Sequence, residues 1–201
     1  MDKVSSKSVA IIVAHPDDEI LWAGGAILTH PFWNCFIVRL CRKNDEDRAT
    51  KIYKVLKILN ATGNMGDLDE KPRQKPLSND EVELSILDLL PQTHFDLIIT
   101  HNTKGEYTRH LRHEETSKAV ISLWHDGKIS TNQLWFFAHE DGNKASLVVI
   151  RILLSLTIKM TQKYWQFWNL WGFSRPINDF NRWWRCRLQR GSGGDASIVN
   201  Y

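Results

Sequence analysis

Two short stretches of the sequence place histidine and acidic residues at spacings that suit a metal ion. The first reads His15-Pro16-Asp17-Asp18-Glu19, in which His15 and Asp18 are three residues apart. On one tight turn these two side chains converge on a single ion, and imidazole nitrogen and carboxylate oxygen are both good zinc ligands. Asp17 is then left available as a base. The alternative is structural, because acidic residues that follow a proline also favour the start of a helix.

The second stretch contains three histidines and begins at Thr100-His101-Asn102. After a short loop it continues from Gly105 to His113, and within it His110 and His113 are again three residues apart. One of these two histidines would complete a site of two histidines and one carboxylate with an open position for water, as catalytic zinc requires. The alternative is that all three are solvated loop histidines. Two clusters that each follow a predicted strand favour the metal site.

The elements that must position these clusters are short apolar runs that alternate with helical patterns. The predicted strands are residues 8–14, 35–40, 95–100 and 133–138. The predicted helices, whose apolar residues repeat along one helical face, are residues 47–61, 80–90 and 113–124. This alternation predicts an α/β, Rossmann-like fold, a parallel sheet flanked by helices. Ligands of such sheets bind at the carboxyl ends of the strands, and residues 62–79 are predicted to be a surface loop beside that edge.

Length and composition narrow the class of protein. The chain has 201 residues, 42% of them hydrophobic and 24% charged, which excludes a fully disordered protein and is enough for one large domain. Three cysteines without a CxxC pair support neither a disulfide scaffold nor a cysteine zinc knuckle. The apolar run at residues 9–14 is too short for a signal peptide. We therefore expect a cytoplasmic protein.

The net charge of +3 hides an asymmetry along the chain. Residues 1–143 carry a net charge of −4, whereas residues 144–201 carry +7 and five of the nine tryptophans. Three interpretations of residues 147–201 stay open: a last helix that packs on the sheet, a basic amphipathic anchor on anionic lipid, or a reading-frame slip near codon 147. The loss of acidic residues slightly favours the slip over the anchor. Residues 191–200 are expected to be disordered.

Taken together, these residues resemble the PIG-L/LmbE family of zinc-dependent N-acetylglucosaminyl deacetylases. Ala14 to Glu19, followed by Gly24-Gly25, is similar to the family's first signature. The T-H-N-x-x-G-E-Y stretch at residues 100–107 and His110-Leu111-Arg112-His113 resemble its second motif, usually H-x-x-H. The resemblance covers about residues 8–146. It implies a deacetylase domain at 1–146 with an LmbE-like fold, followed by the atypical basic, Trp-rich segment 147–201.

The resemblance also implies a role for each residue of the two motifs. His15, Asp18 and His113 match the three ligands of one Zn²⁺ ion. Asp17 matches the general base, which takes a proton from the attacking water. His110 matches a histidine that, when protonated, stabilises the oxyanion or protonates the leaving amine. The implied reaction is hydrolysis of an N-acetyl group, a linear amide C–N bond, with release of acetate and a free amino sugar.

Two further residues are candidate substrate contacts. Arg48 matches an arginine that contacts the substrate sugar, and Tyr107 is a candidate hydrogen-bond donor, with a packed loop tyrosine as the alternative. One pair of residues departs from the family pattern, because Leu111-Arg112 stands where Pro-Asp is usual between the two histidines. This difference leaves the spacing of the two histidines unchanged. The substrate contacts that the family's Pro-Asp pair would make cannot be carried over to Leu111-Arg112.

The function implied is that of a metal-dependent amide hydrolase acting on an N-acetylglucosamine conjugate, with a phosphatidylinositol glycoside as one example and Zn²⁺ as the cofactor. An alternative from another class is a non-catalytic module whose basic, Trp-rich tail binds a membrane or a polyanion. Nucleic acid is not expected as a partner of the enzyme. Contact of the tail with a membrane surface would make the cytoplasmic protein a peripheral membrane protein.

Overall fold

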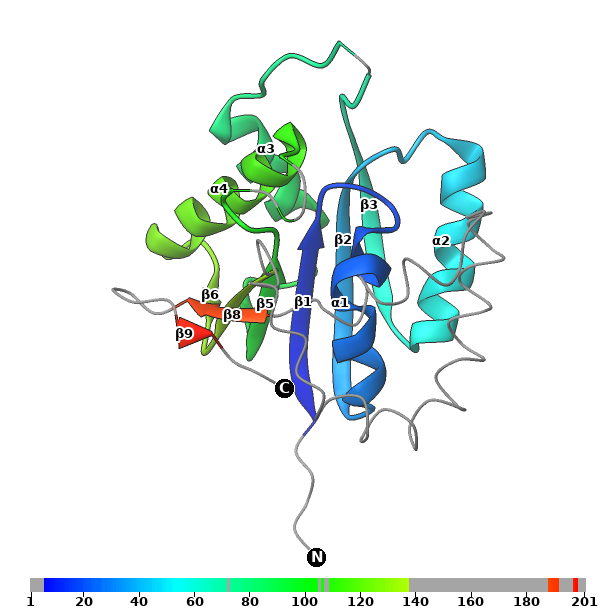
Figure 1. Ribbon diagram of the computed structural model, residues 1–201, viewed down its shortest axis with the longest axis vertical. Helices are drawn as coiled ribbons and strands as arrows, with labels where there is room; N and C mark the ends of the chain where they lie inside the picture. Colours follow the sequence, from blue (N-terminus) through cyan, green and yellow to red (C-terminus); the bar gives the residue numbers. More distant parts are fainter. Residues whose placement is uncertain are drawn as a thin grey trace, which may run out of the picture.

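A parallel sheet forms the centre of the fold. The computed structural model describes residues 6–71, 73–104, 106 and 109–137, with the backbone of residues 188–191 and 197–198. The parallel strands are β1 (Lys7–Val13), β2 (Trp33–Cys41), β3 (Thr62–Leu68), β5 (Leu97–Thr100) and β7 (Leu134–Phe137). Their spatial order is β3-β2-β1-β5-β7 (Figure 1). Antiparallel β8 (Leu188–Gly191) and β9 (Ser197–Ile198) extend the sheet beyond β7, and β4 (His94–Phe95) pairs separately with β6 (Ser130–Thr131).

Helices cover both faces of this sheet, as Figure 1 shows. On one face lie α1 (Asp18–Thr29) and α2 (Glu46–Leu59), which pack against the sheet in one apolar core. On the other lie α3 (Asn79–Leu89) and α4 (Leu111–His125), which belong to a second core. The α/β, Rossmann-like fold class is therefore confirmed. The helices at 47–61, 80–90 and 113–124 are also confirmed to within two residues at each end.

The strand β1 is buried on both faces, which explains its continuous apolar run. Val9 and Ile11 point into the core with α1 and α2, whereas Ala10 and Ile12 point into the core with α3 and α4. In the parallel register Ile11 lies between Ile37 of β2 and Ile99 of β5. Parallel strands end at the same edge of a sheet, so the segments that follow β1, β2, β3 and β5 meet there.

The prediction of a surface loop over residues 62–79 is wrong for its first seven residues, which form the strand β3. The glycines that suggested a loop are instead required by strand pairing. A Cβ atom on Gly63 would lie 2.1 Å from the carbonyl oxygen of Ile37, and one on Gly66 would lie 2.8 Å from that of Leu40. Only glycine lets β3 approach β2 so closely, and β3 is the edge of the sheet.

Asp96 joins the start of β5 to the start of β1. The backbone N–H and the hydroxyl of Ser8 both donate to Asp96 Oδ2, at 2.8 and 2.7 Å, and the Ser8 hydroxyl accepts from the Asp96 N–H. These hydrogen bonds from Ser8 hold the pKa of Asp96 below its usual range. The charged form of this carboxylate therefore stabilises the folded state.

Replacing Asp96 with asparagine is expected to lower the free energy of unfolding at pH 7 and to have a smaller effect in acid. The folded-state pKa is depressed, so the stabilisation is present above the unfolded-state pKa of about 3.9 and is lost as the pH falls through the lower folded-state value. Urea unfolding of both proteins between pH 7 and pH 2.5 measures this convergence. A stability difference that stays constant over the whole range would contradict it.

The remaining sequence predictions about the ends of the chain fall mostly outside the described residues. The domain boundary at residue 146 and the three interpretations of residues 147–201 lie there, apart from the backbone of β8 and β9. Cys35 and Cys41 are buried thiols of β2 without a disulfide. Among the described helices, none has the length and apolar character needed to cross a membrane.

Candidate metal centre

The turn after β1 brings His15 and Asp18 together through an unusual backbone conformation at Asp17. Asp17 has φ 113° and ψ −28°, in the positive-φ region that few non-glycine residues adopt. The His15 N–H donates to Asp18 Oδ2 at 2.9 Å, and the Asp17 N–H donates to Glu19 Oε2 at 3.1 Å. Glu19 itself is fully buried and accepts from Arg39 Nη2 at 2.9 Å. Two carboxylates and a buried ion pair thus hold the turn.

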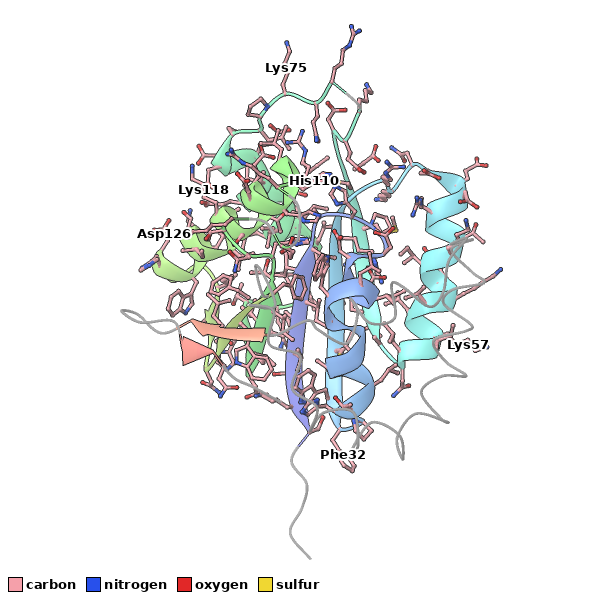
Figure 2. All side chains as sticks on the ribbon, in the orientation of Figure 1. Phe32, Lys57, Lys75, His110, Lys118 and Asp126 are labelled. Atoms are coloured by element: carbon pink, nitrogen blue, oxygen red, sulfur yellow. The ribbon has the colours of Figure 1, made fainter. Side chains whose placement is uncertain are left out.

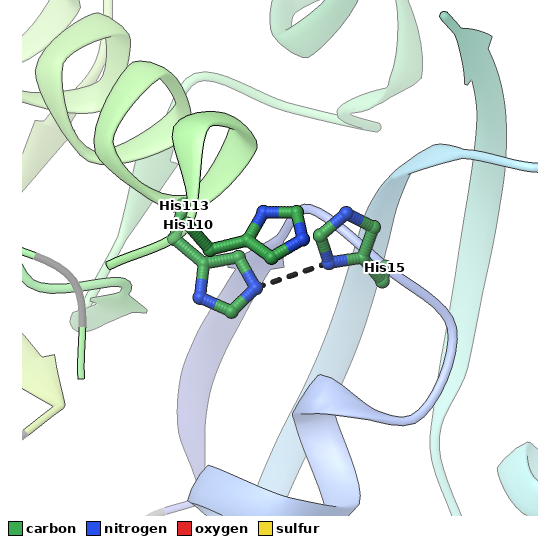
Figure 3. Close-up of side chains that lie close together, drawn as sticks. All are labelled: His15, His110 and His113. Atoms are coloured by element: carbon green, nitrogen blue, oxygen red, sulfur yellow. Dashed lines mark hydrogen bonds between the residues drawn. The ribbon is translucent and has the colours of Figure 1, made fainter. Parts of the chain in front are cut away.

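Three side-chain atoms from the two predicted stretches form a small triangle at the carboxyl edge of the sheet. His15 Nδ1 lies 3.1 Å from Asp18 Oδ2 and 3.0 Å from His113 Nε2, and His113 Nε2 lies 3.3 Å from Asp18 Oδ2. Figure 3 shows His15, from the turn after β1, and His113, from α4, pointing toward one another. All three residues are buried.

This triangle fits a tetrahedral metal ion. Ligand atoms held about 2.0–2.2 Å from zinc in tetrahedral geometry lie about 3.3–3.6 Å apart, close to the spacing observed. The donor set, two imidazole nitrogens and one carboxylate oxygen, is one that catalytic zinc sites use. The structure thus brings the three ligands predicted from the sequence to one point, and it brings them there from segments almost 100 residues apart.

Electrostatics at the triangle also suit a cation. Burial raises the pKa of Asp18, but His113 and His101 outweigh it and hold that pKa well below its usual range. Burial lowers the pKa of His113, but Asp18 and the hydrogen bond to Glu106 outweigh it and raise the pKa to about 10. The site therefore favours positive charge at the point where the three ligand atoms meet.

Glu106, a residue for which the sequence predicted no separate role, orients His113. Its Oε2 accepts from His113 Nδ1 at 2.6 Å, and its Oε1 accepts from His101 Nδ1 and from the Asn102 N–H, both at 2.9 Å. The bond to Glu106 keeps the proton on His113 Nδ1 and turns Nε2 toward the triangle. A carboxylate behind a metal-binding histidine is a common arrangement. The G-E-Y stretch at residues 105–107 was the signal in the sequence.

Two other groups of metal-ligating atoms overlap this triangle, and each has a chemical objection. One contains His101, whose Nε2 already accepts from the Ala14 N–H at 3.0 Å. The other contains His15, Cys41 and Glu70. Burial raises the pKa of the Cys41 thiol to about 12, so it stays protonated, and Arg42 already pairs with Glu70.

His110 lies beside the triangle, and His110 with His15 and His113 forms a further group of three nearby ligand atoms. Its ring lies edge-on to His15 and stacks on His113, with centroids 4.5 and 4.6 Å apart (Figure 3). Burial, together with the charges of His113 and His15, lowers the pKa of His110 to about 4. The protonated form expected from the sequence is therefore disfavoured. A neutral His110 still has one N–H to donate.

Asp17 directly precedes Asp18 in the sequence but is not part of the triangle. It belongs to none of the groups of converging ligand atoms found within the described ranges. Burial and the charges of Asp18 and Glu19 raise the pKa of Asp17 to about 8, and Arg48 opposes this rise. Arg48 Nη1 lies 3.3 Å from Asp17 Oδ2, so the arginine expected to contact a sugar contacts this carboxylate. Tyr107, the other expected substrate contact, lies outside the described residues.

Comparisons with known proteins identify the fold. No protein-family model matches the chain. An uncharacterised protein of Acanthamoeba polyphaga mimivirus is 20% identical, and the match covers 56% of each protein, so the chain spans just over half the length of this curated relative. The hydratase GalB from Pseudomonas putida, which acts on 4-carboxy-2-hydroxymuconate, has a TM-score of 0.53 at 16% identity, over 89% of this chain and 82% of its own.

Deacetylases are also among the solved structures similar to the chain. The zinc-inhibited form of teicoplanin deacetylase Orf2 has a TM-score of 0.47 at 16% identity, over 64% of this chain and 67% of its own. Both structures are only 16% identical to the chain, and the hydratase has the higher TM-score. The likeness to the hydratase therefore defines the shared α/β fold. Neither likeness identifies the reaction, since one fold can carry different chemistries.

Proposed function

We propose that this protein is a metal-dependent amide hydrolase that removes an N-acetyl group from an N-acetylglucosamine conjugate. One observation carries the proposal: His15 Nδ1, Asp18 Oδ2 and His113 Nε2 lie within 3.3 Å of one another, and the charge of Asp18 acts on the carboxylate of Asp17, the preceding residue, which is not among them. Three protein ligands and an adjacent base are what hydrolysis with an open metal position requires.

In the proposed reaction, different residues bind the metal ion, transfer the proton and position the base. A divalent ion held by His15, Asp18 and His113 would lower the pKa of a water and polarise the amide carbonyl. Asp17 takes one proton from that water, and the oxygen of the water forms a bond to the carbonyl carbon of the amide. Arg48 keeps the Asp17 carboxylate in place through their 3.3 Å contact. The raised pKa of Asp17 suits a group that must accept a proton and then give it back.

The second half of the reaction breaks the C–N bond. A neutral His110 donates its N–H to the oxygen that gains negative charge. Asp17 returns its proton to the nitrogen, which leaves as an amine, and the acyl group leaves as acetate. One water is consumed for each amide bond cleaved. The choice of an N-acetylglucosamine conjugate is supported by the resemblance of the two motifs to the PIG-L/LmbE deacetylases.

The test is a hydrolysis assay on N-acetylglucosaminides with lipid, thiol, nucleotide and glycan aglycones. We expect the zinc-loaded protein to release acetate and primary amine in equal amounts from at least one aglycone class. A chelator should abolish the release, and added Zn²⁺ should restore it. Stoichiometric zinc without amide cleavage on any of these compounds would overturn the proposed reaction. Hydration of a carbon–carbon double bond would then be the next reaction to assay, since the hydratase shares this fold.

A further inference from the structure

The ring of His15 has a second nitrogen that faces away from the triangle. When Nδ1 serves as a ligand, a neutral imidazole carries its proton on Nε2. His15 Nε2 is buried and makes no hydrogen bond. A buried N–H without an acceptor is costly, so a nearby acceptor has a strong effect on the orientation of the ring. The carboxylate oxygen Oε1 of Glu70 lies 3.3 Å from this nitrogen.

Glu70 is itself held from two sides, and the first is Arg42. Arg42 Nε and Nη2 donate to the two carboxylate oxygens of Glu70, the latter at 3.2 Å, and the guanidinium also lies 3.5 Å from Asp45. Arg42 directly follows β2 and has φ 66°, a conformation that L-residues rarely adopt. The strained backbone at the end of β2 therefore carries the side chain that fixes Glu70.

The second side is the backbone of Glu70 itself. Glu70 belongs to the β3–α3 loop, residues 69–71 and 73–77, and this loop is anchored to α4. In Figure 1 it passes from the end of β3 to the α3 and α4 side of the sheet, and Figure 2 labels Lys75 on it and His110 at the start of α4. Arg112 of α4 donates from Nε to the Asp69 carbonyl at 2.7 Å and from Nη2 to the Lys75 carbonyl at 2.9 Å. Its Nη1 pairs with Glu115, which accepts from the Leu77 N–H at 3.0 Å.

These contacts connect the two halves of the triangle. Arg112 is almost fully buried and lies next to His113 in the sequence, so the same turn of α4 supplies one ligand and anchors the loop behind the other. Arg112 also stands at the position where the resembled family has aspartate. In this chain the arginine at that position anchors the β3–α3 loop to α4.

We infer that Glu70 is a positioning residue for the metal ligand His15, fixed by Arg42 and by the β3–α3 loop that Arg112 anchors to α4. The inference rests on the proposed function, because it takes His15 as a metal ligand. It adds that metal affinity depends on a carboxylate that does not touch the ion. With Glu106 behind His113 and Glu70 behind His15, each histidine ligand has its own carboxylate.

The test measures the dissociation constant of Zn²⁺ by competition with a chromophoric chelator. Glu70→Ala is expected to weaken binding by about 10–100-fold, the usual effect of losing such a partner. Glu70→Gln should recover much of the loss, because its amide oxygen can take the place of Glu70 Oε1, which lies 3.3 Å from His15 Nε2. Arg112→Gln should weaken binding less than Glu70→Ala. The double variant should match Glu70→Ala alone, since Arg112 acts through Glu70.

The matched controls come from an ion pair at the start of the same helix. The exposed Arg109 pairs with the half-buried Glu114, and Arg109→Gln and Glu114→Ala should leave the dissociation constant unchanged. Thermal unfolding of the metal-free variants checks that Glu70→Ala still folds. An unchanged dissociation constant for Glu70→Ala would overturn the inference, as would additive effects of Glu70→Ala and Arg112→Gln.

The inference and the proposed function can fail separately. Zinc binding that weakens in Glu70→Ala, in a protein that cleaves no N-acetyl group, removes the proposed reaction and supports the positioning role. Acetate release by a protein whose zinc affinity is the same with and without Glu70 supports the reaction and overturns the positioning role.

Discussion

Replacing His113 with alanine is expected to strip the metal from the protein and to abolish hydrolysis. The change removes one of the three proposed ligands and leaves the buried carboxylate of Glu106 without one of its two histidine partners. Losing a partner of a buried charge is itself destabilising. Zinc content after dialysis, measured by elemental analysis, should fall from about one ion per chain to a background level, and acetate release should fall with it.

Two matched variants make this result specific. His125→Ala removes an exposed histidine from the other end of α4 and should keep the metal. His110→Ala tests the overlapping group of His15, His110 and His113, and under our assignment it also keeps the metal. If His113→Ala binds zinc with wild-type affinity, the assignment is wrong, and His15, Cys41 and Glu70 become the remaining group to test.

Most of the sheet and its helices could be predicted because the pattern of apolar residues along each segment agrees with the faces that are buried in the fold. The run at residues 8–14 is apolar on both faces, and β1 is buried on both faces. The edge strand β3 could not be predicted in this way. Its Gly63 and Gly66 signal a loop when the sequence is considered alone, and their role becomes visible only when β2 lies against them. Pairing between strands is information that a local pattern does not contain.

The candidate ligands could be predicted for a related reason. His15 and Asp18 lie on one turn, and His110 and His113 follow the neighbouring strand of the sheet, so the topology of parallel strands brings both clusters to one edge. The choice of His113 over His110 as a ligand came from the resemblance to the PIG-L/LmbE deacetylases. The carboxylates behind the ligands could not be predicted. Glu70 and Glu106 reach His15 and His113 across loops whose course depends on tertiary contacts, such as those of Arg112 with the carbonyls of Asp69 and Lys75.

The fold determines where a site can form, whereas the side chains at the site determine which reaction takes place there. A hydratase has this fold, so the α/β sheet establishes where a site can form but not which bond is made or broken there. In the proposed function the triangle holds a divalent ion, which would favour reactions that such an ion assists. The residue that separates a hydrolase from a passive metal-binding protein is therefore one that lies beside the ion and moves a proton. Asp17 is that residue in the proposed function.

Replacing Asp17 with asparagine is expected to lower turnover by about 100-fold or more, the scale of losing a general base, while zinc content stays at the wild-type level. Asparagine suits this position because, after glycine, asparagine and aspartate best tolerate a positive φ, so the turn that holds His15 and Asp18 should persist. Its amide oxygen can still accept from Arg48. The variant therefore removes proton transfer and changes little else.

Asp47→Asn is the matched control, because Asp47 is an exposed carboxylate of α2 that pairs with Lys51 and lies outside the site. It removes the same charge and should leave turnover and zinc content unchanged. Turnover is measured as acetate release, and zinc content by elemental analysis of the same samples. If Asp17→Asn loses zinc together with activity, Asp17 coordinates the ion and the roles of Asp17 and Asp18 must be exchanged. If it keeps both zinc and full turnover, another group takes the proton, and His110, whose ring lies against His15 and His113, is the next candidate to test.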